Sequence, residues 1–330
     1  MTTSAEPMSD ERTRSERVPD FFIVGQAKSG TTALYSMLKA HPQIYMPDVK
    51  EPRYLASDLR DRFHIPATST VPDTLEKYLA LFAPAGPDQL AGEASPSYLT
   101  SRTAAATIAE LQPAARIIAI LREPSSFVYS LHLQFVQAHV ETEKNLRKAL
   151  ELESSRRQGK NVPRRSHRPN VLLYSDHVHY VEQLRRYHAV FPPEQVLVLI
   201  YDDFRSDNEA TVAKVLRFLE VDDTPPVPPR QVNPTVEVRA QRVHQIVHAI
   251  AAGRGPLARS VQASARALAP RGLSRSSAVA IRDRIFFTKP SPPDEKLMLE
   301  LRHRFKGEVV ALSEYLDRDL VTLWGYDEIG

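Results

Sequence analysis

The chain has 330 residues, no cysteine and a formal net charge of +3. Without cysteine it forms no disulfide and no thiolate zinc site. No stretch approaches the roughly 18 uninterrupted apolar residues of a membrane helix, and the charged residues 1–18 contain no apolar signal-peptide core. We therefore expect residues 1–18 to be a disordered tail and the protein to be cytoplasmic.

The first apolar run, residues 21–24, predicts a buried strand that leads into a glycine-bounded loop at 25–32 and then a helix. Bare N–H groups of such a loop and helix N-terminus favour a phosphate-like anion. In a nucleotide-triphosphatase loop the lysine follows the second glycine. Here Thr31 follows Gly30, and Lys28 lies inside the loop. The sequence therefore predicts an anion site whose lysine approaches from a different side.

A second anion-binding element follows the apolar run 116–121, which predicts another buried strand. Arg122 ends this strand, and Ser130 lies two turns into the helix expected after it. Both could contact one anion, because the planar guanidinium matches phosphate oxygens. Two anion-binding elements at the carboxyl ends of two strands are what a bisphosphorylated nucleotide requires.

These two elements resemble those of sulfotransferases that use 3'-phosphoadenosine 5'-phosphosulfate (PAPS). In that family a K-x-G-T-T loop binds the 5'-phosphosulfate, and an arginine-to-serine pair at this spacing binds the 3'-phosphate. Further stretches are similar to the heparan-type and related bacterial members, at 50–55, 92–98, 195–204 and 316–320. The resemblance spans about residues 20–325 and is loosest at about 225–290.

The resemblance implies PAPS as co-substrate, its 3',5'-bisphosphate product (PAP), and no required metal. The residues expected to bind PAPS are Gln26, Ala27, Lys28, Ser29, Gly30, Thr31, Thr32, Arg122 and Ser130. Sulfuryl transfer leaves negative charge on the bridging oxygen, which positioned donors must stabilise. Lys28 is the candidate for this task.

An acceptor hydroxyl benefits from a general base. Glu51 is the first candidate, because it matches the family's K-E segment, and Lys50 beside it could orient the acceptor. His41 competes for this role, although a position at a helix terminus suits it better. The residues expected near the acceptor substrate are Glu51, Arg53, Glu93 and Ser95. For Glu93 the alternative is that it pins a loop.

The segment 238–282 has no acidic residue and many arginines. It is either a solvated face or a basic helical insert, at about 225–290, that caps the acceptor site and could make peripheral membrane contact. No motif or aromatic interleaving accompanies this charge, so we expect no nucleic-acid partner. The acceptor would be a small molecule, a glycan or a lipid-linked compound, sulfated on a hydroxyl in preference to an amine.

Strands that alternate with helices favour a doubly wound parallel sheet. The resemblance implies a three-layer α/β fold like that of P-loop kinases, in one domain over 19–330, and a bacterial type of enzyme. Two other classes stay open: a P-loop kinase or NTPase that uses Mg-ATP, and a non-catalytic nucleotide-binding module.

Overall fold

The computed structural model describes residues 17–59, 71–163, 166, 169–223, 237–238, 287–288 and 292–329. Nearly all of the predicted tail and of the basic segment 238–282 lies outside these residues. The chain divides into two compact units. The first comprises Met1–Phe127, Ser175–Asn233 and Leu299–Gly330, and the second Val128–Tyr174 and Pro234–Met298. A single domain over 19–330 stays a prediction.

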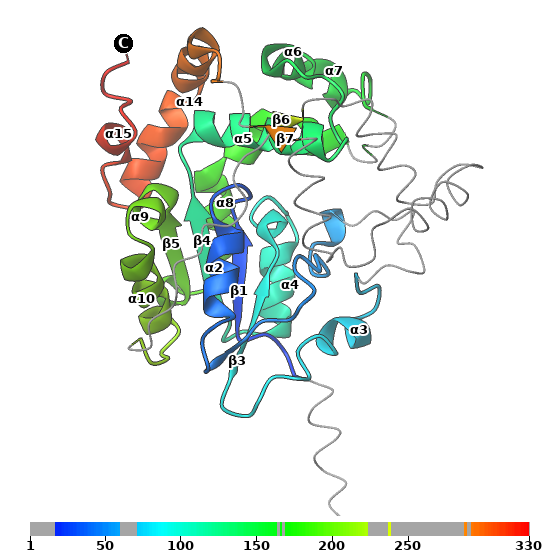
Figure 1. Cartoon of the computed structure of the whole chain (residues 1–330), viewed down its shortest axis with the longest axis vertical. Coiled ribbons are helices and arrows are strands. Elements are labelled where there is room, and N and C mark those ends of the chain that lie inside the picture. Colours follow the sequence, from blue (N-terminus) through cyan, green and yellow to red (C-terminus); the bar gives the residue numbers. More distant parts are fainter. Residues whose placement is uncertain are drawn as a thin grey trace, which may run out of the picture. The chain divides into compact units, whose positions relative to one another are not determined.

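The first unit contains a five-stranded sheet with the strand order β2-β3-β1-β4-β5. Figure 1 labels β3, β1, β4 and β5 of this sheet. All four strand pairings are parallel. The bounds are Phe21–Gly25 for β1, Ile44–Tyr45 for β2, Leu90–Ala94 for β3, Arg116–Leu121 for β4 and Val196–Ile200 for β5. The predicted strands at 21–24 and 116–121 are thus confirmed. Their continuous apolar runs are typical of parallel strands that are covered on both faces.

The helices of the first unit are α2 (Thr31–Leu38), α3 (Leu75–Leu79), α4 (Ala104–Leu111), α8 (Tyr180–His188), α9 (Tyr201–Ser206), α10 (Asn208–Phe218) and α15 (Leu320–Leu323). Short 3₁₀ turns lie at η1 (Ser57–Leu59), η2 (Pro96–Tyr98) and η5 (Pro193–Gln195). Three elements have residues in both units: α5 (Pro124–Gln137), η4 (Tyr174–Val178) and α14 (Glu295–Tyr315). Among the described helices, none is both long and apolar enough to cross a membrane.

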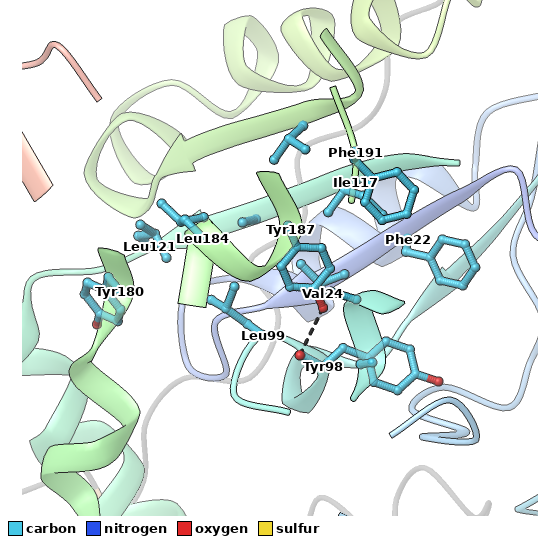
Figure 2. Packing of buried hydrophobic residues seen from close by; sticks show 14 of the residues in the cluster. Phe22, Val24, Tyr98, Leu99, Ile117, Leu121, Tyr180, Leu184, Tyr187 and Phe191 are labelled. Atoms are coloured by element: carbon cyan, nitrogen blue, oxygen red, sulfur yellow. Dashed lines mark hydrogen bonds between the residues drawn. The ribbon is translucent and has the colours of Figure 1, made fainter. Parts of the chain in front are cut away.

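Two hydrophobic clusters cover the two faces of the sheet. Successive strand residues point to opposite faces, so Phe22 and Val24 join one cluster while Phe21 and Ile23 join the other. The first cluster includes side chains of α4, α8, α14 and α15, and the second includes side chains of α2, α9 and α10. Figure 2 shows the first cluster, in which the Tyr187 hydroxyl donates to the Tyr98 carbonyl at 3.0 Å. This arrangement confirms the predicted three-layer α/β fold.

The second unit includes α6 (Leu146–Glu151), α7 (Glu153–Arg157), the turn η3 (Pro169–Leu172), and the short antiparallel strands β6 (Glu237–Val238) and β7 (Phe287–Thr288). Its described interior holds a charged pair. The buried Arg156 guanidinium donates to both carboxylate oxygens of buried Glu141, at 2.7 and 2.9 Å, and the Tyr174 hydroxyl donates to Glu141 at 3.0 Å. Removing either partner of such a pair is destabilising, because the other charge is then buried and unpaired.

Candidate active site

The loop after β1 lies where the chain leaves two neighbouring strands in opposite directions. From β1 it crosses through α2 to β2 at one edge of the sheet, and from β4 it continues to β5 at the other edge. Ligands of open α/β sheets bind in the crevice outside the carboxyl ends of such strands. Residues 26–30 follow β1 and Arg122 follows β4, so the loop and Arg122 lie at the same carboxyl edge of the sheet.

The loop and the first turn of α2 offer uncommitted backbone donors. Helix α2 begins after Gly30, which has a φ of 89°, and no side chain caps its N-terminus. Within the described part of the chain, four backbone N–H groups of this stretch donate to no protein acceptor: those of Lys28, Gly30, Thr31 and Thr32. Donors of this kind, together with the helix dipole, favour a bound anion.

Two predicted PAPS-binding residues, Gln26 and Ser29, have buried side chains. The buried Gln26 side chain accepts from the Ala27 N–H at 3.0 Å and donates to the His177 carbonyl at 2.8 Å. Ser29 is also completely buried. Their side chains thus face the protein, and the loop presents mainly its backbone and Lys28.

Gly30→Ala should damage this loop. The φ of 89° is unfavourable for a residue with a Cβ, and a Cβ at this position would lie 2.9 Å from Cδ1 of Phe204. We expect a loss of about 1–3 kcal/mol in the free energy of unfolding and weaker anion binding, measured by urea denaturation and by phosphate titration.

The control is Gly307→Ala in α14, where an added Cβ would meet no neighbouring atom within 4 Å. It should stabilise the helix by up to about 1 kcal/mol. Equal stability of Gly30→Ala and the wild type would contradict this account.

Two cations, Lys28 and Arg122, lie close to each other at this edge of the sheet. Arg122 donates from Nη1 to the carbonyl of Lys28 at 3.0 Å, and its guanidinium carbon lies 5.0 Å from the centre of the Tyr201 ring. Burial, and then the charge of Arg122, lowers the pKa of Lys28. Among the described residues, no carboxylate pairs with either cation. Two adjacent, partly desolvated positive charges without a counter-charge are suited to a ligand with several negative charges.

Ser130, the predicted partner of Arg122, lies in the part of α5 that belongs to the second unit. The pairing of Arg122 with Ser130 at one phosphate therefore stays a prediction.

The segment 50–55 lies at the carboxyl end of β3, beside β1. Its Glu51 N–H donates to the carbonyl of Ala94, the last residue of β3, at 3.0 Å, and its Arg53 N–H donates to Oγ of Ser95 at 3.0 Å. Both Glu51 (φ 59°) and Arg53 (φ 55°) adopt the left-handed region. Non-glycine residues adopt this region only where the surrounding structure imposes it, often at functional sites.

The Glu51 carboxylate is paired with two cations of its own segment. Nζ of Lys50 lies 2.9 Å from one oxygen, and Arg53 donates to the other. Burial raises the pKa of Glu51, but the charges of Lys50 and Arg53 outweigh it, so the pKa lies below its ordinary value. Glu51 is therefore ionised at neutral pH, and 32% of its side chain is exposed.

The family of the chain follows from a comparison with known families. A family model described as "Sulfotransferase domain" matches residues 18–245, which is more than half of the chain. The chain belongs to the sulfotransferase family. This finding confirms the predicted family.

Human sulfotransferases are among the similar sequences. Carbohydrate sulfotransferase 15 is 27% identical over 257 residues, which cover 62% of this chain and 44% of that protein. Bifunctional heparan sulfate N-deacetylase/N-sulfotransferase 3 is 28% identical over 229 residues, which cover 65% and 24%. The chain thus spans less than half the length of these relatives. A solved sulfotransferase from Alicyclobacillus acidocaldarius is 26% identical, with a TM-score of 0.58, and the match covers 72% of this chain and 97% of that one.

Two residues that we predicted to bind the acceptor substrate have no exposed surface. Glu93 and Ser95 are both completely buried, so the prediction of direct substrate contact is not supported. Glu93 accepts from the hydroxyls of Tyr78 and Tyr98, each at 2.8 Å, and Ser95 accepts from Arg53. The alternative prediction, that Glu93 pins a loop, agrees with this geometry.

His41 and the loop that contains Lys28 lie at opposite ends of helix α2. Helix α2 runs away from its N-terminus at the loop, and His41 follows its C-terminal end, just before β2. In a parallel sheet this is the amino edge, opposite the crevice. The buried His41 ring accepts from the Gln43 N–H at 3.2 Å, and Nε2 lies 2.8 Å from the Asp222 carbonyl. The structure thus does not bring His41 to Lys28, and its contacts fit the alternative role at a helix terminus.

Sequence reasoning gave no role to three tyrosines of the site. Tyr201 stacks against Arg122, while Tyr78 and Tyr98 bind Glu93. Tyr201 and Tyr98 occur in stretches that resemble family motifs, and that position was a usable signal. Tyr78 gave none, because it lies on a separate short helix, α3, and only the fold brings it to β3.

Proposed function

We propose that this protein transfers a sulfuryl group from PAPS to a hydroxyl of a carbohydrate or another small acceptor. The observation that carries the proposal is the pair of adjacent cations, Lys28 and Arg122, without a carboxylate partner among the described residues, beside free backbone N–H groups at the crevice. PAPS carries negative charge at both its 5'-phosphosulfate and its 3'-phosphate, and the two elements after β1 and β4 suit these groups.

Each residue of the site has a separate role in sulfuryl transfer. PAPS, when bound, supplies an activated sulfuryl group on a phosphate leaving group. Glu51 accepts the proton of the acceptor hydroxyl as the new sulfur–oxygen bond forms. Lys28 stabilises the negative charge that develops on the bridging oxygen as the old bond breaks. Arg122, with the predicted partner Ser130, selects the 3'-phosphate, and Lys50 orients the acceptor.

Carbohydrate acceptors are favoured because similar proteins are named for carbohydrate and heparan sulfate sulfation. A suitable probe is desulfated heparan sulfate, with release of PAP from PAPS as the measured signal. PAP release without added carbohydrate is the blank from which transfer to the carbohydrate is measured. A kinase or NTPase that uses Mg-ATP is not favoured, because the chain belongs to the sulfotransferase family and its loop lysine precedes Gly30.

The donor site is tested by calorimetric titration in EDTA with PAP, AMP and ATP. We expect tight metal-free binding of PAP and weak binding of AMP. Arg122→Ala should lower PAP affinity roughly 10- to 100-fold, the effect of losing a charge-assisted hydrogen bond, and should leave AMP binding unchanged. The control is Arg185→Ala, an arginine that also lies over a tyrosine ring, that of Tyr315. Stronger binding of ATP, and only with magnesium, would favour the kinase alternative instead.

A further inference from the structure

Glu93 is a buried carboxyl group that the proposed reaction does not use. It lies on β3 with no exposed surface. Its Oε2 accepts from the hydroxyls of Tyr78 and Tyr98, each at 2.8 Å. The Ser95 side chain is a further hydrogen-bonding group beside this carboxyl. Complete burial of a carboxyl group is unfavourable unless such hydrogen bonds offset it, so the contacts that hold Glu93 in the interior need an account.

Both tyrosines that bind Glu93 also contact the segment that carries Glu51. The Tyr98 hydroxyl accepts from the Leu55 N–H at 3.1 Å. The Tyr78 ring stacks on the Tyr54 ring, with ring centres 5.0 Å apart and an angle of 18° between the planes. Glu93 therefore fixes two groups that in turn hold two consecutive residues of the 51–55 segment.

This segment needs to be held, because its backbone is strained. Glu51 and Arg53 both have a positive φ, a conformation that persists only where neighbouring contacts impose it. We propose that Glu93 is a positioning residue: through Tyr78 and Tyr98 it holds residues 51–55 in the conformation that presents Glu51 to the acceptor. This inference rests on the proposed role of Glu51 as the base.

The hold on the segment should depend on pH. The titratable groups that face Glu93 are Tyr78 of α3, Tyr98 of η2, Tyr187 of α8 and Glu51. Complete burial, which outweighs the hydroxyl donors, raises the pKa of Glu93 to about 7. An ionised carboxylate accepts hydrogen bonds about twice as strongly as a neutral group. Above this pH the tyrosines are therefore held firmly, and below it the hold weakens.

The test compares PAP release by the wild type and by Glu93→Gln between about pH 5.5 and pH 8. Glutamine keeps the shape of the side chain but stays neutral, as protonated Glu93 is. We expect the wild-type kcat to rise roughly 5- to 20-fold across the pKa of Glu93, the difference between a charged and a neutral acceptor. Glu93→Gln should stay near the low-pH value throughout, with an unchanged KM for PAPS. The control is Glu182→Gln, an exposed glutamate on α8 that pairs with Arg186 at 2.8 Å.

A second measurement does not depend on activity. Hydrogen exchange of the amides of Glu51, Arg53 and Leu55 should be faster in Glu93→Gln than in the wild type above the pKa, and equal below it. The inference is overturned if the variant matches the wild type in both pH profile and exchange, or if kcat falls equally at every pH. If the proposed function itself is wrong, the wild type will bind no PAP, and the exchange experiment then decides the role of Glu93 alone.

Discussion

Glu51→Gln should lower kcat by about 10²–10⁴, the usual contribution of a general base, and leave PAP affinity within about twofold. The structure explains both halves of this expectation. The Glu51 carboxylate is ionised and partly exposed at the end of β3. Its charged partners are Lys50 and Arg53 rather than residues of the Lys28 loop, so its loss should not disturb the donor site. PAP release from PAPS in the presence of desulfated heparan sulfate measures the first effect, and calorimetric titration with PAP measures the second.

Glu220→Gln is the matched control for this experiment. Glu220 pairs with Arg116 on the surface, so the substitution also removes a carboxylate from an ion pair. It should change kcat less than twofold. If Glu51→Gln keeps full activity, the base lies elsewhere and the role assigned to Glu51 is wrong.

The pH dependence separates Glu51 from Glu93. Because Lys50 and Arg53 lower the pKa of Glu51, activity that requires ionised Glu51 persists as the pH falls and is lost only below the ordinary glutamate range. Glu93, with its pKa of about 7, should produce the fall in activity near neutrality. The pH–activity profile should therefore show two separate falls on its acidic side, one for each glutamate. Only the fall near neutral pH should disappear in Glu93→Gln.

The sheet and the anion loop could be predicted because their signals are local. Residues 21–24 are apolar throughout, and Gly25 and Gly30 bound the loop that follows. An apolar run at 116–121 that ends in Arg122 gives the second element in the same way. In a parallel sheet the carboxyl ends of neighbouring strands share one edge, so two local patterns were enough to predict that the loop after β1 and Arg122 lie at the same edge.

The environment of Glu93 could not be predicted because it depends on contacts between distant residues. Its position after Gly92 is compatible with an exposed or a buried side chain. What buries it is Tyr78, 15 residues earlier in the sequence, together with Tyr98. The positive φ values of Glu51 and Arg53 likewise accompany hydrogen bonds that only the folded chain forms, from the Glu51 N–H to Ala94 and from the Arg53 N–H to Ser95.

Lys28→Met should lower kcat by about 10²–10³, the typical effect of removing one donor that stabilises charge in the transition state. It should also raise the thermal midpoint of unfolding of the free protein. The charge of Lys28 is partly buried and lies close to that of Arg122, without a carboxylate partner among the described residues. Methionine keeps much of the apolar length of the side chain and removes this unfavourable charge.

The pH dependence of Lys28 has a definite sign. A lysine with a lowered pKa loses its proton at a lower pH than a free lysine does, so activity should fall as the pH rises through that value. Bound PAPS, being negatively charged, should raise the pKa of Lys28 again. The alkaline fall should therefore appear at lower pH in kcat/KM for PAPS, which reports the free enzyme, than in kcat, which reports the complex.

Lys39→Met is the matched control, because Lys39 lies just past the opposite end of α2 and pairs with Asp48. It should leave kcat unchanged and should not raise the thermal midpoint. A lower kcat together with a higher midpoint in Lys28→Met alone would mean that the fold maintains an unfavourable charge because the ligand requires it. A lower kcat with a lower midpoint would instead mean that Lys28 supports the loop, and the developing charge would need another donor.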